Sequence, residues 1–250
     1  MGSITEVFAD VISYARSQKI QVVRITGTKR ATLFEGVDNA KNCRICMRAV
    51  ARQIFDQLIG RFGIEDLNLL KKLIETNKKM NGTAYYTYCR FFNPPLLDGL
   101  RFETEYGKSK YYFLRDKLPQ ILVEKEDAIK WNFTFVPEEI LIEGFRKAAR
   151  VHAKLERNFV IRSADGKLFF EIEAEDDYGL PVSSAKFCMA HGLTCDLNPP
   201  VHWQCSTFFK IIWTARKCKK LVSISNMGVI QIYVDTGLVK YEFVLPGFKS

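Results

Sequence analysis

The pattern of hydrophobic and polar positions between residues 137 and 173 predicts a helix followed by two strands. Pro137 is tolerated in a first helical turn, and the two glutamates after it suit the positive end of the helix dipole. Residues 158–162 and 167–173 read as strands around a tight Ala164-Asp165-Gly166 turn, in which Gly supplies the positive φ. At helical spacing the predicted apolar face comprises Ile140, Leu141, Gly144, Phe145, Ala148 and Ala149, and the basic face comprises Arg146, Lys147, Arg150 and Lys154.

The same order of helix, strand, turn and strand opens the chain. Ser3 is a suitable N-cap for a helix over residues 4–18, and Arg16 and Lys19 end it with positive charge. Strands at 21–25 and 31–35 follow around a turn that contains Gly27. The apolar stripe of this helix is Val7, Phe8, Val11, Ile12 and Ala15.

The ends of the two halves of the chain also match. Residues 100–106 and 110–115 form one predicted hairpin and residues 229–235 and 239–245 another, with turns at Gly107 and Gly237. Each hairpin is followed by a proline, Pro119 or Pro246. Self-similarity at a spacing of about half the chain predicts an internal duplication of one helix-and-sheet module.

The rest of the first half contains one further helix. Residues 43–57 favour a long strand, with a helix over part of them as the alternative, and residues 83–92 read as a strand that Asn93-Pro94-Pro95 ends. Between these strands, residues 64–77 have the spacing of an amphipathic helix. That helix turns Leu67, Leu70, Leu73 and Ile74 inward and gathers Lys71, Lys72, Lys78 and Lys79 at its exposed end, where cations suit the dipole.

The second half is predicted to repeat this order. Residues 116–127 lack a clear period and connect the halves. The predicted strands are 129–136, 185–190, 207–214 and 221–225, and the basic residues 217–220 lie in a loop. Where the first half has its second helix, this half offers only Asp196-Leu197-Asn198-Pro199-Pro200, which is long enough for a single turn.

Composition narrows the class of protein. A chain of 250 residues with 47% hydrophobic residues can fill one large or two smaller cores. The sequence has no apolar run near the ~20 residues of a membrane span and no signal-peptide pattern, and its seven cysteines form no regular framework. We therefore expect a protein of the cytosol that is not secreted. The net charge of +9 favours a polyanionic partner such as nucleic acid.

In element order over nearly the whole chain, the sequence resembles DNA polymerase sliding clamps, most of all those of the T-even bacteriophages. The resemblance is most specific at residues 64–73, at 136–154 leading into the Ala164-Asp165-Gly166 hairpin, and at 208–213 with the hairpin that ends in Phe243-Val244-Leu245-Pro246. Three features depart from the T-even clamps, which are generally shorter and acidic overall. This chain is basic, it gains length around residues 78–99, and residues 196–200 give little room for a fourth helix.

The resemblance implies an α+β fold of two similar helix-and-sheet domains of the DNA-clamp type, with helices on the inner face of a ring and antiparallel sheets outside. The implied divisions are residues 1–116, an interdomain connector at 117–128, and residues 129–250. It also implies a homotrimeric ring in the cytoplasm of an infected host cell that encircles double-stranded DNA and tethers the replicative DNA polymerase. A clamp loader and RNA polymerase accessory factors for viral late transcription are further implied partners.

Two sets of site residues follow from this resemblance. The residues that would face DNA are Arg16, Lys19, Lys71, Lys72, Lys78, Lys79, Arg146, Lys147, Arg150 and Lys154. The residues that would bind the short hydrophobic tail of a client protein are Leu118, Pro119, Ile121, Leu122, Phe243, Val244, Leu245, Pro246 and Phe248. For Phe243 and Leu245, the alternative is that they complete the inward face of the last strand.

Other interpretations of the chain remain open. A basic helix face is often only a solvated surface. Cys43 and Cys46 have the C-x-x-C spacing of a redox or metal motif, but no second cysteine pair and no βαβ pattern accompany them, so we interpret them as two strand thiols. Asp176 and Asp177 lie in a turn-like acidic stretch and are more typical of turn residues than of metal ligands. The chain has no Gly-rich phosphate loop, HExxH or GxSxG, so we expect neither an enzyme nor a bound cofactor or metal. The alternative function is a basic nucleic-acid-binding or transcription-accessory protein in which zinc is held by Cys188, His191, Cys195, His202 and Cys205.

Overall fold

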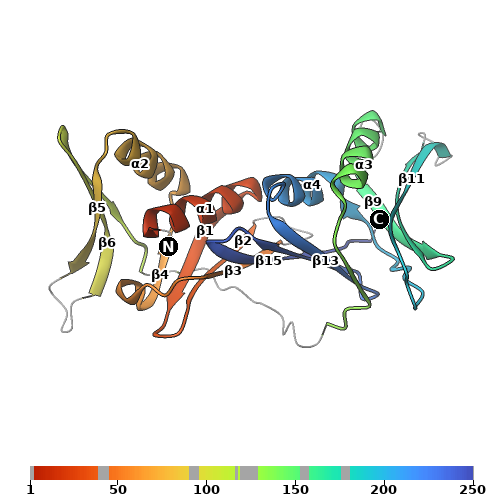
Figure 1. The fold of residues 1–250 in the computed structure, drawn as a ribbon, viewed down its shortest axis with the longest axis horizontal. Coiled ribbons are helices and arrows are strands. Elements are labelled where there is room, and N and C mark those ends of the chain that lie inside the picture. Colours follow the sequence, from red (N-terminus) through yellow and green to blue (C-terminus); the bar gives the residue numbers. More distant parts are fainter. Residues whose placement is uncertain are drawn as a thin grey trace. The chain divides into compact units, whose positions relative to one another are not determined.

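The computed structural model describes residues 3–38, 45–89, 96–115, 118, 129–152, 158–175 and 181–249. The chain divides into two compact units, which are described one at a time (Figure 1). The first unit comprises Met1–Asn39, Cys46–Leu122 and Thr236–Tyr241, and the second comprises Ala40–Ile45, Val123–Asp235 and Glu242–Ser250. The final strand of the chain therefore begins in the first unit and ends in the second.

The first unit contains two helices over antiparallel strands. Its strands form one sheet in the order β4-β1-β2-β3, in which β3 is followed by the start of β15, and a second sheet in the order β5-β6-β7. Its elements are α1 (Ile4–Ser17), β1 (Ile20–Gly27), β2 (Thr32–Asp38), β3 (Cys46–Ala51), the 3-10 turn η1 (Asp56–Leu58), β4 (Gly60–Ile64), α2 (Leu67–Lys79), β5 (Thr83–Cys89), β6 (Leu96–Thr104) and β7 (Gly107–Tyr112).

The predicted start and stripe of α1 are confirmed. The Ser3 hydroxyl accepts a hydrogen bond from the Glu6 backbone N–H, and the Glu6 carboxylate accepts one from the Ser3 N–H at 2.7 Å, which forms a complete capping box. All five predicted stripe residues are buried. Phe8 among them meets Phe34 and Phe113 edge to face, with ring centroids 6.0 and 6.2 Å apart. Helices α1 and α2 lie side by side on the strands of this unit (Figure 1).

The second unit repeats the arrangement. Its sheets have the orders β11-β10-β9-β12 and β15-β14-β13-β8, and α3 packs on β10 and β11 and contacts α4 (Figure 1). Its elements are β8 (Phe133–Phe135), α3 (Glu139–His152), β9 (Asn158–Ala164), β10 (Lys167–Glu175), β11 (Pro181–His191), β12 (Trp203–Gln204), α4 (Cys205–Thr214), β13 (Lys219–Ser225), β14 (Val229–Asp235) and β15 (Val239–Pro246).

The core of the second unit is aromatic. Phe145 of α3 lies with its ring centroid 5.5 Å from Phe159 and 5.6 Å from Phe170, and the buried Trp203 donates its indole N–H to the Leu245 carbonyl at 3.2 Å. The turn between β9 and β10 has positive φ at both Asp165 (51°) and Gly166 (67°). These angles confirm the predicted tight hairpin and add Asp165 to its left-handed positions.

The predicted internal duplication is confirmed in element order and in pairing. From its first helix onward, each unit runs helix, four strands, helix, three strands; the second unit has the short β8 in addition, before α3. The sheet order β4-β1-β2-β3 corresponds to β12-β9-β10-β11. An isolated bridge joins Gly63 of β4 to Leu114 after β7, and its counterpart joins His202 next to β12 to Phe248 after β15. Strands β7 and β15 are thus equivalent, as are β3 and β11.

One strand prediction is wrong in kind, and another is correct over only part of its length. Residues 207–214 form most of helix α4, because Cys205, Phe208, Ile211 and Ile212 are buried at helical spacing. Residues 43–57 do not form one long strand in the described part. Strand β3 ends at Ala51, after which the Arg52 N–H turns to the Leu238 carbonyl at 2.9 Å and η1 follows.

Smaller corrections concern element ends and one helix face. Helix α2 begins at Leu67, where Asp66 accepts a hydrogen bond from the Leu69 N–H at 2.9 Å, and not at residue 64. Strand β8 covers only Phe133–Phe135, and Lys219 and Lys220 lie in β13. Ile140 was predicted on the apolar face of α3 but is 76% exposed. Ile142, which was not predicted there, is buried instead.

The predicted connector, residues 117–128, lies outside the described residues except for Leu118, so its boundaries stay a prediction. No helix in the described part of the chain is long and apolar enough to span a membrane.

Candidate nucleic-acid interface

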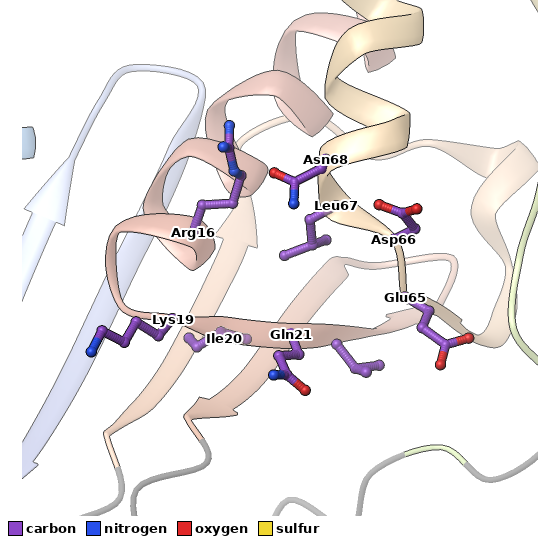
Figure 2. Close-up of a pocket in the computed structure, with 9 residues that line it drawn as sticks. Arg16, Lys19, Ile20, Gln21, Glu65, Asp66, Leu67 and Asn68 are labelled. Carbon is purple, nitrogen blue, oxygen red and sulfur yellow. The ribbon is translucent and has the colours of Figure 1, made fainter.

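The residues after α1, the start of β1 and the start of α2 line an open pocket on the first unit. Its volume is about 510 Å³, and its charged lining residues are Arg16, Lys19, Glu65 and Asp66. Figure 2 shows Asn68 of α2 directed toward the end of α1 that carries Arg16. Lys19 leaves α1 with a left-handed backbone, φ 60°, which turns the chain sharply from the helix into β1.

The acidic side of this pocket is held in place by α2 and β7. The Asp66 carboxylate caps α2, and the Glu65 N–H donates to the Tyr111 hydroxyl at 3.2 Å. Burial raises the pKa of Tyr111 to about 12, so its hydroxyl stays protonated at neutral pH. Two cations and two carboxylates line the pocket together, and their charges balance. Arg16 and Lys19 are therefore exposed cations in a mixed polar surface and do not form a purely basic site.

Helix α2 presents most of its lysines to solvent. Lys72, Lys78 and Lys79 are exposed, and Lys71 forms an ion pair with Glu75 one turn along the helix at 3.6 Å. Such i,i+4 pairs at the surface contribute only ~0.3–0.5 kcal/mol, so a stronger anion can replace the glutamate.

Helix α3 presents three of its four predicted cations. Lys147 pairs with Glu143 at 3.4 Å, Arg150 is exposed, and the Arg146 guanidinium lies over the Trp213 indole, 4.2 Å from the ring centroid. The fourth, Lys154, lies outside the described residues. Three of the four predicted residues of this helix therefore lie on its solvent side or at its junction with α4.

Helix α4 adds cations that the sequence analysis missed. Lys210 is exposed on α4, and Arg216 and Lys217 are exposed directly after it. Because residues 207–214 were interpreted as a strand, Lys210 was not assigned to a helix face. The helical spacing of Phe208, Ile211 and Ile212 was the available signal, and it also places Lys210 and Trp213 on the opposite, solvent side.

The predicted client-binding residues are divided between core and surface. Phe243 and Leu245 are buried in the inward face of β15, which agrees with the alternative that they complete the inward face of the last strand. Val244, Pro246 and Phe248 are half-buried, and Phe248 exchanges two backbone hydrogen bonds with His202, at 2.8 and 3.0 Å. Leu118 is half-buried, whereas Pro119, Ile121 and Leu122 lie outside the described residues.

The cysteines and histidines of the zinc hypothesis do not gather in the described part of the chain. Cys188 and His191 approach each other, with Sγ and Nε2 3.6 Å apart. Among the described residues, no group of three or more His, Cys, Asp or Glu side chains is placed to hold a metal. A zinc site would need at least one further ligand.

Comparison with known proteins identifies the fold. No family model and no curated protein match the sequence. Among solved structures, the chain is similar to the PCNA of A. fulgidus bound to the C-terminal region of FEN-1, with TM-score 0.66 and 14% identity over 98% of this chain and 96% of that one. It is also similar to the PCNA of Thermococcus kodakaraensis, with TM-score 0.64 and 10% identity over 98% and 97%. The chain therefore has the clamp fold of the PCNA structures.

Proposed function

We propose that this protein is a sliding clamp that encircles double-stranded DNA and has no catalytic activity. One observation carries the proposal: in both units of a duplicated clamp fold, exposed cations lie on the helices or within three residues of a helix end. These cations are Arg16, Lys19, Lys72, Lys78, Lys79, Lys147, Arg150, Lys210 and Lys217. The net charge of +9 gives the attraction to a polyanion that such a surface needs.

The chemistry of these side chains suits a protein that slides. Exposed lysines contact phosphates as separate point charges, and each contact is weak and independent of base sequence. Sliding requires that no single contact hold the DNA at one position. Ion pairs at Lys71 and Lys147 weaken two of the contacts further, since each must exchange a glutamate for a phosphate.

The repeat indicates how a ring would close. Within one chain, β3 is followed in its sheet by β15. In the repeat, β11 is equivalent to β3 and β7 is equivalent to β15. In the described part of the chain, β11 and β7 are edge strands of two different sheets. We propose that β11 of one subunit pairs with β7 of the next, head to tail, because edge strands that repeat such a pairing close into a ring. Three subunits, as in the phage clamps that the sequence resembles, are the proposed number.

The partners follow from the same proposal. The A. fulgidus PCNA structure holds the C-terminal region of FEN-1. For this chain we propose a client tail that contacts Val244, Pro246 and Phe248, with the replicative polymerase, a clamp loader and late-transcription factors as clients. The exposed part of the Phe248 side chain supplies an apolar contact, and the backbone of Phe248 is already hydrogen-bonded to that of His202.

Native mass spectrometry with crosslinking tests the ring. We expect a species of three times the 28.8 kDa chain mass. In a variant whose seven native cysteines are replaced by serine or alanine, a bismaleimide should join Ser184→Cys on β11 to Ser109→Cys on β7 into a covalent closed trimer that stays on circular DNA and leaves the same DNA once it is linearised. Each single-cysteine variant is the matched control. A monomer that binds circular and linear DNA equally would overturn the clamp and favour the basic nucleic-acid-binding alternative.

A further inference from the structure

The junction of α3 and α4 holds two arginines against one tryptophan. The Arg146 guanidinium lies 4.2 Å from the centroid of the Trp213 ring, and that of Arg216 lies 4.8 Å from it. Trp213 is 39% exposed, so this cluster lies at the surface of the second unit. Three segments meet here: the middle of α3, the last turn of α4 and the residues directly after α4.

Both arginines are held by contacts within the second unit. The Arg216 Nε donates to the Glu139 carboxylate at the start of α3, and this hydrogen bond lowers the pKa of Glu139. Arg146 stacks on the indole, and its Nε is buried without a hydrogen-bond partner. A free arginine has ~2 kcal/mol of rotamer entropy to lose on binding, so ordering it in advance makes binding less costly.

The cluster carries surplus positive charge. Glu139 is the carboxylate that pairs with Arg216, while the neighbouring Glu143 is paired with Lys147 at 3.4 Å. Among the described residues no carboxylate forms an ion pair with Arg146. Lys220 adds a further cation, whose Nζ donates to the carbonyls of Ala215 and Arg216 at 3.1 and 3.2 Å. Four cations, Arg146, Lys147, Arg216 and Lys220, therefore accompany two carboxylates, Glu139 and Glu143, the second of which also interacts electrostatically with Arg216. The excess of positive charge favours an anionic ligand.

We propose that Arg146, Trp213 and Arg216 form a preorganised site for one phosphate of a nucleic-acid backbone, with Trp213 as the positioning residue. The planar guanidinium fork matches phosphate oxygens in pairs, which a lysine cannot do. Exposed cations on the same two helices, Lys147, Arg150 and Lys210, continue the site along a polyanion. This inference rests on the proposed function for the identity of the nucleic acid, and it adds one ordered contact to an otherwise diffuse set.

Fluorescence anisotropy with a labelled linear duplex of about 30 base pairs, read across a salt series, tests the site. Trp213→Leu removes the aromatic face and no charge. We expect it to weaken binding about two- to fivefold, the size of an exposed cation–π contact, and to leave the salt slope unchanged. Arg146→Lys keeps the charge and loses the fork, so we expect a similar loss. Arg30→Lys, the same exchange at an exposed arginine in the turn between β1 and β2, is the matched control and should bind as the wild type does.

The double variant separates positioning from a merely structural role. If Trp213 acts through Arg146, the losses of Trp213→Leu and Arg146→Lys should not add. Unchanged duplex binding by both single variants, or fully additive losses, would overturn the proposal. A Trp213→Leu defect confined to single-stranded DNA would also overturn it, because it would show that the indole stacks on bases.

Two checks keep this test separate from the clamp proposal. The duplex is linear, and binding to it does not require a ring. A monomer in native mass spectrometry would therefore overturn the clamp proposal and leave the phosphate-site proposal unaffected. Circular dichroism and thermal unfolding establish that the variants fold. If Trp213→Leu does not fold, the comparison of Arg146→Lys with Arg30→Lys still decides the proposal.

Discussion

Asp10 and Tyr241 lie 231 positions apart in the sequence, yet the Tyr241 hydroxyl donates to the Asp10 carboxylate at 2.9 Å. The Thr236 hydroxyl donates to the same oxygen at 2.8 Å, and the Tyr241 ring lies 4.3 Å from that of Tyr14. All four residues belong to the first unit. The last hairpin of the chain is thus fastened to the first helix by a carboxylate and two hydroxyls.

Asp10→Asn should stabilise the protein at neutral pH. Burial raises the pKa of Asp10 above its ordinary value of 3.8, and the hydrogen bonds from Thr236 and Tyr241 oppose the rise only in part. The folded state therefore binds this proton more tightly than the unfolded state does. The resulting stabilisation is fully present below pH 3.8 and is lost as the pH rises through the folded pKa.

Asparagine keeps an oxygen for the two hydroxyls and has no charge to desolvate. Urea unfolding should give Asp10→Asn a higher midpoint than the wild type at pH 7, with the difference narrowing toward pH 4. Asp10→Ala leaves the buried Tyr241 hydroxyl without this acceptor and should lower the free energy of unfolding by about 1–3 kcal/mol. A constant difference between Asp10→Asn and the wild type across this pH range would contradict the assignment.

Reversing three charges on α3 should impair DNA tethering. Arg146→Glu, Lys147→Glu and Arg150→Glu together replace phosphate contacts with repulsion, so processivity of the cognate polymerase should fall well below that of the wild type. The matched control reverses three exposed cations away from the helices: Lys29, Arg30 and Lys240. Equal processivity in the two triple variants, with both folded, would remove α3 from the DNA-facing set.

Phe248→Ala should weaken the binding of a client tail without disturbing the fold. The backbone hydrogen bonds between residues 248 and 202 do not depend on the side chain, so the end of the chain should keep its place. Truncating an aromatic side chain that is buried at the centre of an interface costs about 2 kcal/mol or more of binding free energy. Calorimetry with the C-terminal peptide of the cognate polymerase measures this decrease in affinity.

Truncation after Leu245 also removes the backbone hydrogen bonds between residues 248 and 202, so it should lower the affinity for the peptide further. It should leave the oligomer intact, because the proposed ring contacts are at β7 and β11. Full peptide affinity in both variants would exclude residues 246–248 from the client site.

Purified protein should contain no stoichiometric zinc. Cys188 and His191 supply two potential ligands, and the described residues bring no third within reach. Elemental analysis by inductively coupled plasma mass spectrometry checks this expectation, and Cys188→Ser should leave the melting temperature nearly unchanged. One zinc per chain, lost in Cys188→Ser, would revive the zinc-containing alternative.

The sequence by itself determined the elements whose signals are local. The capping box at Ser3 and Glu6 and the turn at Asp165 and Gly166 depend on residues a few positions apart, so their pattern could be recognised without the fold. The duplication was also visible, because it is a repeat of such local signals. It led to the clamp fold and to the basic helix faces as the candidate DNA-facing surface.

Only the tertiary structure decided α4 and the cluster around Trp213. Phe208, Ile211 and Ile212 belong to aromatic and β-branched types that favour strands, and burial of one helical face against the core overrode that preference. Arg146 and Trp213 come from different helices, and no local pattern says that two such side chains meet. Their contact exists because α3 and α4 pack together, and packing is set by the whole core and not by neighbouring residues in the sequence.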